Sequence, residues 1–300
     1  MDGMNQKLPA SGMRISSPAL ALMILAASFA FFLILVPVIT GLLGKTGMKY
    51  EALVRISMVI QDVFVFILPA LLAALLATRL PAKLLAVDRA PGVIVTVLSI
   101  LALLVSMPAM NLVVEWNNNL HLPESMAAIE SQLRNMEDAA ANTINTLMEG
   151  AGIGSLVVSI LIIGVLAGFS EELFFRGAMQ RIIMCTKVNG HVAVWLVAII
   201  FSMLHFQFFG FVPRVLLGAY FGYLLWWSRS LWLPIFVHVF NNSVVVYNTW
   251  RTANAPGDTL DIDKIGTDLT TWSGIITVAV SLVLTVAVMT MLYRTCKAKR

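Results

Sequence analysis

The fold class follows first from residues 153–184, which read IGSLVVSILIIGVLAGFSEELFFRGAMQRIIM. Up to Ser170 this run carries no charged side chain. It is long enough to cross a hydrocarbon layer of roughly 30 Å at about 1.5 Å of helical rise per residue. Glu171, Glu172 and Arg176 then appear without ending the apolar pattern. The run therefore predicts a membrane helix that carries ionisable side chains at membrane depth.

The whole chain has the composition of a membrane protein. Of its 300 residues, 59% are hydrophobic and 12% are charged, whereas an ordinary soluble domain has about 25% charged residues. The mean hydropathy is +0.87. This balance excludes a water-soluble enzyme, and two cysteines exclude a disulfide framework. The net charge of +4 fits basic cytoplasmic loops, so we expect no nucleic-acid partner.

Seven more apolar stretches accompany this run, which predicts an all-α, polytopic integral membrane bundle. The expected spans are 18–42, 56–78, 91–114, 153–184, 191–207, 213–228, 231–248 and 271–293. The first stretch is too long for the core of a signal peptide, so we expect a retained helix. No linker separates two units, and residues 1–300 are expected to form one membrane domain.

The loop charges give the bundle a direction, because basic residues collect on the cytoplasmic side. With eight spans, one side receives Arg79, Lys83 and Arg89 together with the basic residues of both termini. The other side receives the acidic stretches 115–152 and 249–270. The basic first loop is the exception. The pattern predicts cytoplasmic termini, and we expect the plasma membrane of a prokaryote.

The acidic stretch 115–152 is expected to be an extramembrane insertion. Within it, residues 123–148 carry apolar side chains at helical spacing, with glutamates and aspartates between them. Such a pattern is typical of an amphipathic helix that lies on the membrane surface or caps the bundle.

Helical spacing assigns different roles to the two adjacent carboxylates. Residues four apart share a helix face, so Glu172 and Arg176 are expected to pair. Neighbours point about 100° apart, which leaves Glu171 free to face another direction. Ionisable groups inside the bilayer are costly, and they mark functional sites by default.

Polar residues in two later spans complete a constellation. His205 lies in the fifth span, and His238 and Asn242 lie four apart in the seventh span. If the fourth and fifth helices run unbroken to their shared turn, Glu171 and His205 both lie about 21 Å from it. The sequence therefore predicts that these residues converge at one depth.

Two chemistries fit this set of side chains. A desolvated carboxylate beside an imidazole can take a proton from water, and an imidazole and a carboxamide can stabilise an oxyanion, which together would hydrolyse an amide. Alternatively, Glu171, His205 and His238 match the one-carboxylate, two-histidine pattern of a catalytic zinc site. The residues alone leave the cofactor open, as either none or zinc.

The motifs Glu171-Glu172-x-x-x-Arg176, Phe201-x-x-x-His205 and His238-x-x-x-Asn242, in this order on membrane helices, resemble the CPBP family. That family comprises intramembrane proteases, including type II CAAX prenyl endopeptidases and bacteriocin-processing or Abi-like membrane proteins. The resemblance covers about residues 160–250. It implies that Glu171 and His205 activate water, and that His238 and Asn242 stabilise the oxyanion. Glu172 and Arg176 would then support the site.

We therefore expect an intramembrane endopeptidase that cleaves a membrane-associated protein or peptide. Its candidate substrates are a lipidated C-terminus and a leader peptide. Membrane lipid is expected to surround the protein. Two alternatives remain. One is a non-proteolytic binding or immunity protein on the same fold, and the other is a proton-coupled transporter that uses Glu171 and His205.

Overall fold

The computed structural model describes residue 14 and residues 17–148, 152–254 and 262–298, and it is helical throughout its regular elements. The long helices or helical runs are α1 (Pro18–Gly44), α2 to α3 (Tyr50–Ala77), α5 (Val93–Asn118), α6 (Ala127–Met148), α7 to α9 (Ile153–Met184), α10 (Gly190–Met203), α11 (Phe211–Ser228), α12 (Trp232–Asn254) and α13 (Trp272–Ala298). The short elements are α4 (Pro81–Leu84) and the 3-10 turns η3 (Glu124–Met126) and η6 (Ile262–Lys264).

Each of the eight predicted spans is a helix, so the predicted polytopic helical bundle is confirmed. Within the described ranges, five helices are long and apolar enough to cross a membrane, namely α1, α2 to α3, α5, α7 to α9 and α13. α10 is a shorter apolar helix. α11 and α12 fall outside that group of five because Arg214, His238 and several asparagines interrupt their apolar surface. The polar helices therefore belong to the interior of the bundle.

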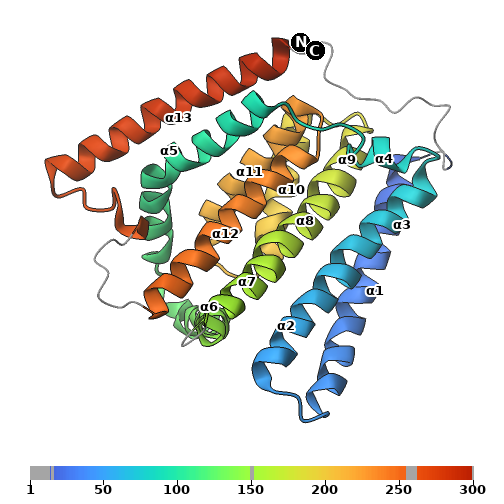
Figure 1. The fold of residues 1–300 in the computed structure, drawn as a ribbon, viewed down its shortest axis with the longest axis horizontal. Helices are drawn as coiled ribbons and strands as arrows, with labels where there is room; N and C mark the ends of the chain where they lie inside the picture. Colours follow the sequence, from blue (N-terminus) through green and yellow to red (C-terminus); the bar gives the residue numbers. More distant parts are fainter. Residues whose placement is uncertain (1–13, 15–16, 149–151, 255–261, 299–300) are drawn as a thin grey trace.

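The bundle has two outer helix pairs around an inner group, as Figure 1 shows. α1 packs against α3 on one edge, and α13 packs against α5 on the other. Between them, α10 packs against α11, and α12 packs against the helical run that begins at α7. The outer helices keep apolar side chains exposed, for example Val93 at 80% and Val283 at 68%. These outward faces suit lipid as the solvent.

α6 confirms the predicted amphipathic helix, with η3 as its first turn. It crosses one end of the bundle, where α12 finishes. The other end carries the connections from α3 to α5 and from α9 to α10, which hold Arg79, Lys83, Arg89 and Lys187. The acidic and basic segments therefore lie at opposite ends, as the loop charges predicted.

The α7 to α9 run is not a regular α-helix. Two π-helical stretches, η4 (Ile160–Leu166) and η5 (Leu173–Gln180), flank α8 (Ala167–Glu172). Such stretches change which side chains share a face, and they occur frequently at functional sites. A second feature is Gly168, where an added Cβ would lie 3.1–3.3 Å from Val239 on α12. This close approach is what brings α8 and α12 into contact.

The predicted end of the fifth span at residue 207 is wrong. α10 ends at Met203, and the chain turns at Phe206, whose φ of 54° is left-handed. His205 therefore lies in the turn between α10 and α11. The depth argument assumed two unbroken helices, and neither the fourth nor the fifth helix meets that condition.

Candidate active site

The predicted pair of Glu172 and Arg176 is confirmed at the centre of the bundle. Arg176 Nη1 donates to Glu172 Oε1 at 2.7 Å, and Arg176 Nη2 donates to the Gly218 carbonyl at 2.9 Å. Both ionic side chains are fully buried. The Arg176 guanidinium also lies 4.5 Å from the centroid of the Phe201 ring. The pair therefore neutralises two charges and joins α8, α10 and α11.

His238 on α12 joins this pair. Its Nδ1 lies 2.8 Å from Glu172 Oε1, the oxygen that Arg176 also binds. A carboxylate only accepts hydrogen bonds, so Nδ1 carries the hydrogen. The ring stacks on Phe221 with 4.6 Å between centroids. Glu172 and Phe221 thereby fix both the position and the tilt of the imidazole.

Glu171 faces the same histidine from the other side. Its Oε2 lies 3.8 Å from His238 Nε2, and its side chain keeps 15% of its surface exposed. The distance is longer than a direct hydrogen bond. The adjacent carboxylates therefore divide their roles as predicted. Glu172 is enclosed in ion pairing, whereas Glu171 stays partly open beside the imidazole.

His205 approaches from the turn after α10. Its Nδ1 lies 2.8 Å from the Phe201 carbonyl, which only accepts, so Nδ1 donates and Nε2 is the unprotonated nitrogen of the neutral ring. Phe201 packs edge-on against both histidines, at 4.8 Å from His205 and 6.1 Å from His238. Phe201 thus links the two histidines, and Glu171 lies beside one of them, His238.

Asn242 lies one turn beyond His238 on α12. Its Nδ2 donates to the Ile163 carbonyl at 3.2 Å, and its Oδ1 accepts from Asn241 Nδ2 at 3.2 Å. A carboxamide nitrogen has two hydrogens, so one donor remains beyond the bond to Ile163. The amide is held against η4 in this structure. Its predicted action beside His238 stays a prediction.

Sequence reasoning missed Asp62. This residue opens the π-helical stretch η2 (Asp62–Ile67), is 4% exposed and accepts a hydrogen bond from Ser170 Oγ at 3.0 Å. The available signal was a lone carboxylate inside the apolar run 56–78. Its position beside residue 170 depends on a contact between two distant helices.

Arg214 is a second residue that the sequence analysis did not single out. It lies in the first turn of α11, and its Nη2 donates to Gln207 Oε1 at 2.6 Å. Gln207 lies two residues after His205, so α11 places a cation beside the turn that carries this histidine.

The zinc alternative names Glu171, His205 and His238 as ligands, and it stays open. In the part of the chain that the structure describes, no three His, Cys, Asp or Glu side chains come together so that they could hold a metal ion. The Nδ1 of His205 and the Nδ1 of His238 are each engaged by a protein oxygen, which leaves Nε2 as the ring nitrogen that faces the site. We derive no step through a metal.

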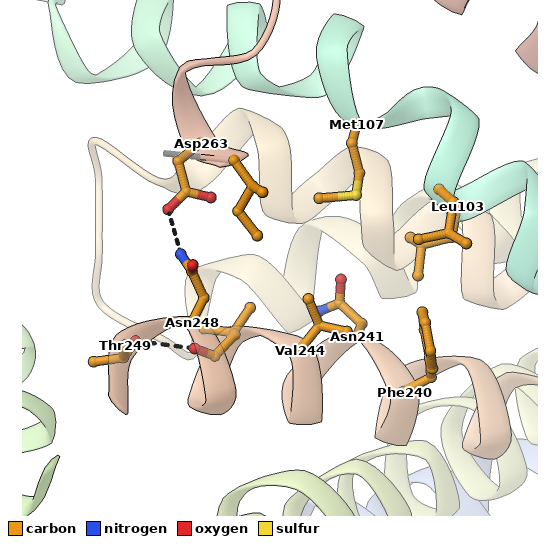
Figure 2. Close-up of a pocket in the computed structure, with 11 residues that line it drawn as sticks. Leu103, Met107, Phe240, Asn241, Val244, Asn248, Thr249 and Asp263 are labelled. Atoms are coloured by element: carbon orange, nitrogen blue, oxygen red, sulfur yellow. Dashed lines mark hydrogen bonds between the residues drawn. The ribbon is translucent and has the colours of Figure 1, made fainter. Parts of the chain in front are cut away.

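A cavity of about 110 Å³ adjoins the neighbouring face of α12. It lies between α12, α5 and η6, and Figure 2 shows Asn241 and Phe240 on one wall and Leu103 and Met107 on the other. At one end Asn248 Nδ2 donates to Asp263 Oδ2 at 3.2 Å. Asn241 connects this cavity to Asn242 through their hydrogen bond.

Comparison with known proteins supports the family resemblance that the three sequence motifs indicate. The family model described as type II CAAX prenyl endopeptidase Rce1-like matches residues 153–244, a range that contains all six predicted site residues. The protein YpbD of Bacillus subtilis (strain 168), described as uncharacterized, is 25% identical over 108 residues, covering 33% of this chain and 52% of YpbD. The chain thus spans about half the length of this curated relative. No solved structure matches. The resemblance to CAAX-type membrane proteases is confirmed over residues 153–244.

Proposed function

We propose that this integral membrane protein is an intramembrane endopeptidase that hydrolyses a peptide bond of a membrane-associated protein or peptide. The observation that carries the proposal is that Glu171 lies beside His238 and that Phe201 packs against both His238 and His205, inside the region that the CAAX-type endopeptidase model matches. A partly exposed carboxylate beside an imidazole, with a second imidazole nearby, is suited to activate a water molecule.

In the proposed mechanism, Glu171 and His205 bind the attacking water. Glu171 accepts a proton as the water oxygen adds to the scissile carbonyl carbon. The His205 Nε2, unprotonated in the neutral ring, orients the same water. The proton then passes to the leaving nitrogen as the carbon–nitrogen bond breaks. The products are a carboxylic acid and an amine, and Glu171 returns to its starting form.

His238 and Asn242 are assigned to the developing oxyanion. When both ring nitrogens of His238 are protonated, Nε2 donates towards the site while Nδ1 stays bound to Glu172. The second hydrogen of Asn242 Nδ2 supplies the other donor. Such preorganised donors stabilise the transition state more than the ground state. Glu172 and Arg176 hold His238 in place and do not touch the substrate.

The proposed substrates are membrane-bound because the site lies among apolar helices. A lipidated C-terminus fits the matched family, and a leader peptide is the second candidate. We propose cytoplasmic termini, on the grounds that basic connections lie at one end of the bundle and the acidic helix α6 at the other. The plasma membrane of a prokaryote stays the expected location.

The test uses purified protein in phosphatidylcholine vesicles that also contain a farnesylated CAAX peptide and unmodified membrane-helix peptides. Products are identified by mass spectrometry for the native protein and for His205→Ala. We expect defined cleavage products from the native protein and none from the variant, with both proteins equally inserted and folded. Absence of any product that depends on His205 would contradict the proposal. Binding of peptide without cleavage by either protein would instead favour the non-proteolytic alternative.

A further inference from the structure

The turn that carries His205 has little helical support of its own. α10 ends at Met203 and α11 begins at Phe211; backbone hydrogen bonds to carbonyls three or four residues back continue as far as Phe206, which has a positive φ, and resume at Phe211. Within the turn, Ser202 Oγ donates to the Phe211 carbonyl at 2.8 Å. Placing an imidazole accurately on such a segment requires contacts from other elements.

The first such contact comes from α6. Glu137 Oε1 accepts a hydrogen bond from the Phe209 backbone N–H at 2.6 Å. Phe209 is 1% exposed, and the Arg134 guanidinium lies 3.8 Å from its ring centroid. A charged acceptor on a backbone N–H makes one of the stronger hydrogen bonds in proteins. The amphipathic helix therefore holds the middle of the turn through both its backbone and its side chain.

The second contact comes from the end of α5. Asn117 is 1% exposed, and its two amide atoms bind both sides of the turn. Its Oδ1 accepts from the Val212 N–H at 2.8 Å, and its Nδ2 donates to the Phe208 carbonyl at 3.3 Å. A single carboxamide thus fixes the spacing between the turn and the first turn of α11.

The contacts from α6 and from the end of α5 are connected through Arg134. Arg134 Nη2 donates to the Leu120 carbonyl at 2.8 Å, and Arg134 Nε donates to Glu130 Oε1 at 2.9 Å. The end of α5, the start of α6 and the turn therefore form one assembly. These holding residues lie in the segment 115–152, outside the range 153–244 that the family model matches.

We infer that the segment 115–152 positions His205, with Glu137 and Asn117 as positioning residues for the proposed reaction. They act through Phe208, Phe209 and Val212 and do not touch the substrate. This inference rests on the proposed function for the expected loss of cleavage rate. The expected displacement of the His205 ring can be measured without any activity. A displacement of about 1 Å at a reacting group can reduce the rate by about a hundredfold.

The test compares Glu137→Ala with Glu137→Gln in the full-length protein in vesicles, with cleavage of the farnesylated CAAX peptide as the assay. The glutamine oxygen can still accept the Phe209 N–H. We expect kcat to fall roughly 10- to 100-fold in Glu137→Ala with KM unchanged within about twofold, and most of the rate to return in Glu137→Gln. Asp138→Ala is the matched control, because it removes an exposed carboxylate from the adjacent position of α6.

A second readout does not need activity. Nitrogen-15 resonances of the imidazoles are recorded, with His205 assigned by its absence from a His205→Gln spectrum. We expect the His205 signal to move in Glu137→Ala and in Asn117→Ala, and to stay in place in Glu137→Gln and Asp138→Ala. A protein that cleaves nothing but shows these shifts would refute the proposed function and leave the positioning role standing. An unmoved His205 signal with unchanged kcat, or an equal change in Asp138→Ala, would overturn the positioning role.

Discussion

His238 Nδ1 lies 2.8 Å from Glu172 Oε1 in the fully enclosed centre of the bundle. The same oxygen accepts from Arg176, so one carboxylate holds both a cation from its own helical run and an imidazole from α12. This arrangement explains why a charge pair is kept at membrane depth. It sets the position of a histidine whose other nitrogen faces Glu171.

Removal of the Arg176 cation should therefore disrupt the positions of both Glu172 and His238. In Arg176→Met, Glu172 stays buried without its charge partner, which for buried pairs costs about 3–5 kcal/mol. We expect a markedly lower thermal midpoint in detergent and loss of cleavage. Lys187→Met, which removes an exposed cation from the α9 to α10 connection, is the control and should change neither. An Arg176→Met protein as stable as the control would refute this role.

The close contact of α8 and α12 predicts a steric effect at Gly168. The added Cβ of Gly168→Ala meets the backbone and side chain of Val239 at 3.1–3.3 Å, so the two helices must separate. We expect destabilisation by about 1–3 kcal/mol, as for other overpacked interiors, together with slower cleavage because His238 moves away from Glu172. Unfolding in denaturant and initial rates measure the two effects.

Gly154→Ala provides the comparison, because nothing lies within 4 Å of its Cβ position. We expect unchanged or slightly increased stability, since alanine restricts the unfolded chain more than glycine does. If both alanine variants behave alike, the helix contact at Gly168 is not what sets the geometry of the site.

The amphipathic helix α6 should have an acid-sensitive anchor at Glu130. The Leu122 backbone N–H donates to its Oε2 at 2.8 Å, and Arg134 and His121 contact its Oε1. These contacts lower the pKa of Glu130 to about 2 from its usual 4.5. Because the folded-state pKa is the lower one, the stabilisation is complete above pH 4.5 and is lost as the pH falls towards 2.

Hydrogen exchange of the Leu122 amide reports on this anchor. We expect protection to fall with acidification in the native protein and to be low at every pH in Glu130→Ala. Glu124→Ala, an exposed glutamate at the start of the same segment, should behave as the native protein. Protection that does not vary with pH in the native protein would contradict the role of the Glu130 carboxylate.

Metal removal distinguishes water activation without a metal from water activation by zinc. The donor atoms of Glu171, His205 and His238 do not form a metal-holding group among the described residues, so we predict that cleavage survives exhaustive treatment with a chelator. Elemental analysis of the purified protein should be made on the same sample. Loss of cleavage on chelation, with recovery on adding zinc, would assign these residues to a metal site instead.

Several features of the site follow from local sequence rules. Glu172 and Arg176 pair because residues four apart share a helix face, and that relation survives the nearby π-helical stretch. Hydrophobicity locates all eight long membrane-region helices, and the amphipathic pattern locates α6. These are properties of one helix at a time, which is why the sequence predicts them.

Other features depend on contacts between distant segments. Asp62 reaches Ser170 across 108 positions, and Glu137 reaches Phe209 across 72. No periodicity encodes such contacts. The end of α10 at Met203 was also missed, because Leu204 and Phe206 extend the apolar run and the positive φ of Phe206 is not visible in the sequence. Apolar content predicts burial in a membrane, but it does not distinguish a helix from a turn that other helices support.

The most direct test of the account is the initial rate of peptide cleavage by Glu171→Gln in vesicles, measured beside Glu124→Gln. The substitution at residue 171 keeps the shape of the side chain and removes its capacity to accept a proton from water. We predict that the rate falls by about 10²- to 10⁴-fold, the usual contribution of a general base, while folding, insertion and the Glu124→Gln rate are unchanged. A Glu171→Gln protein that cleaves at the native rate would contradict the account.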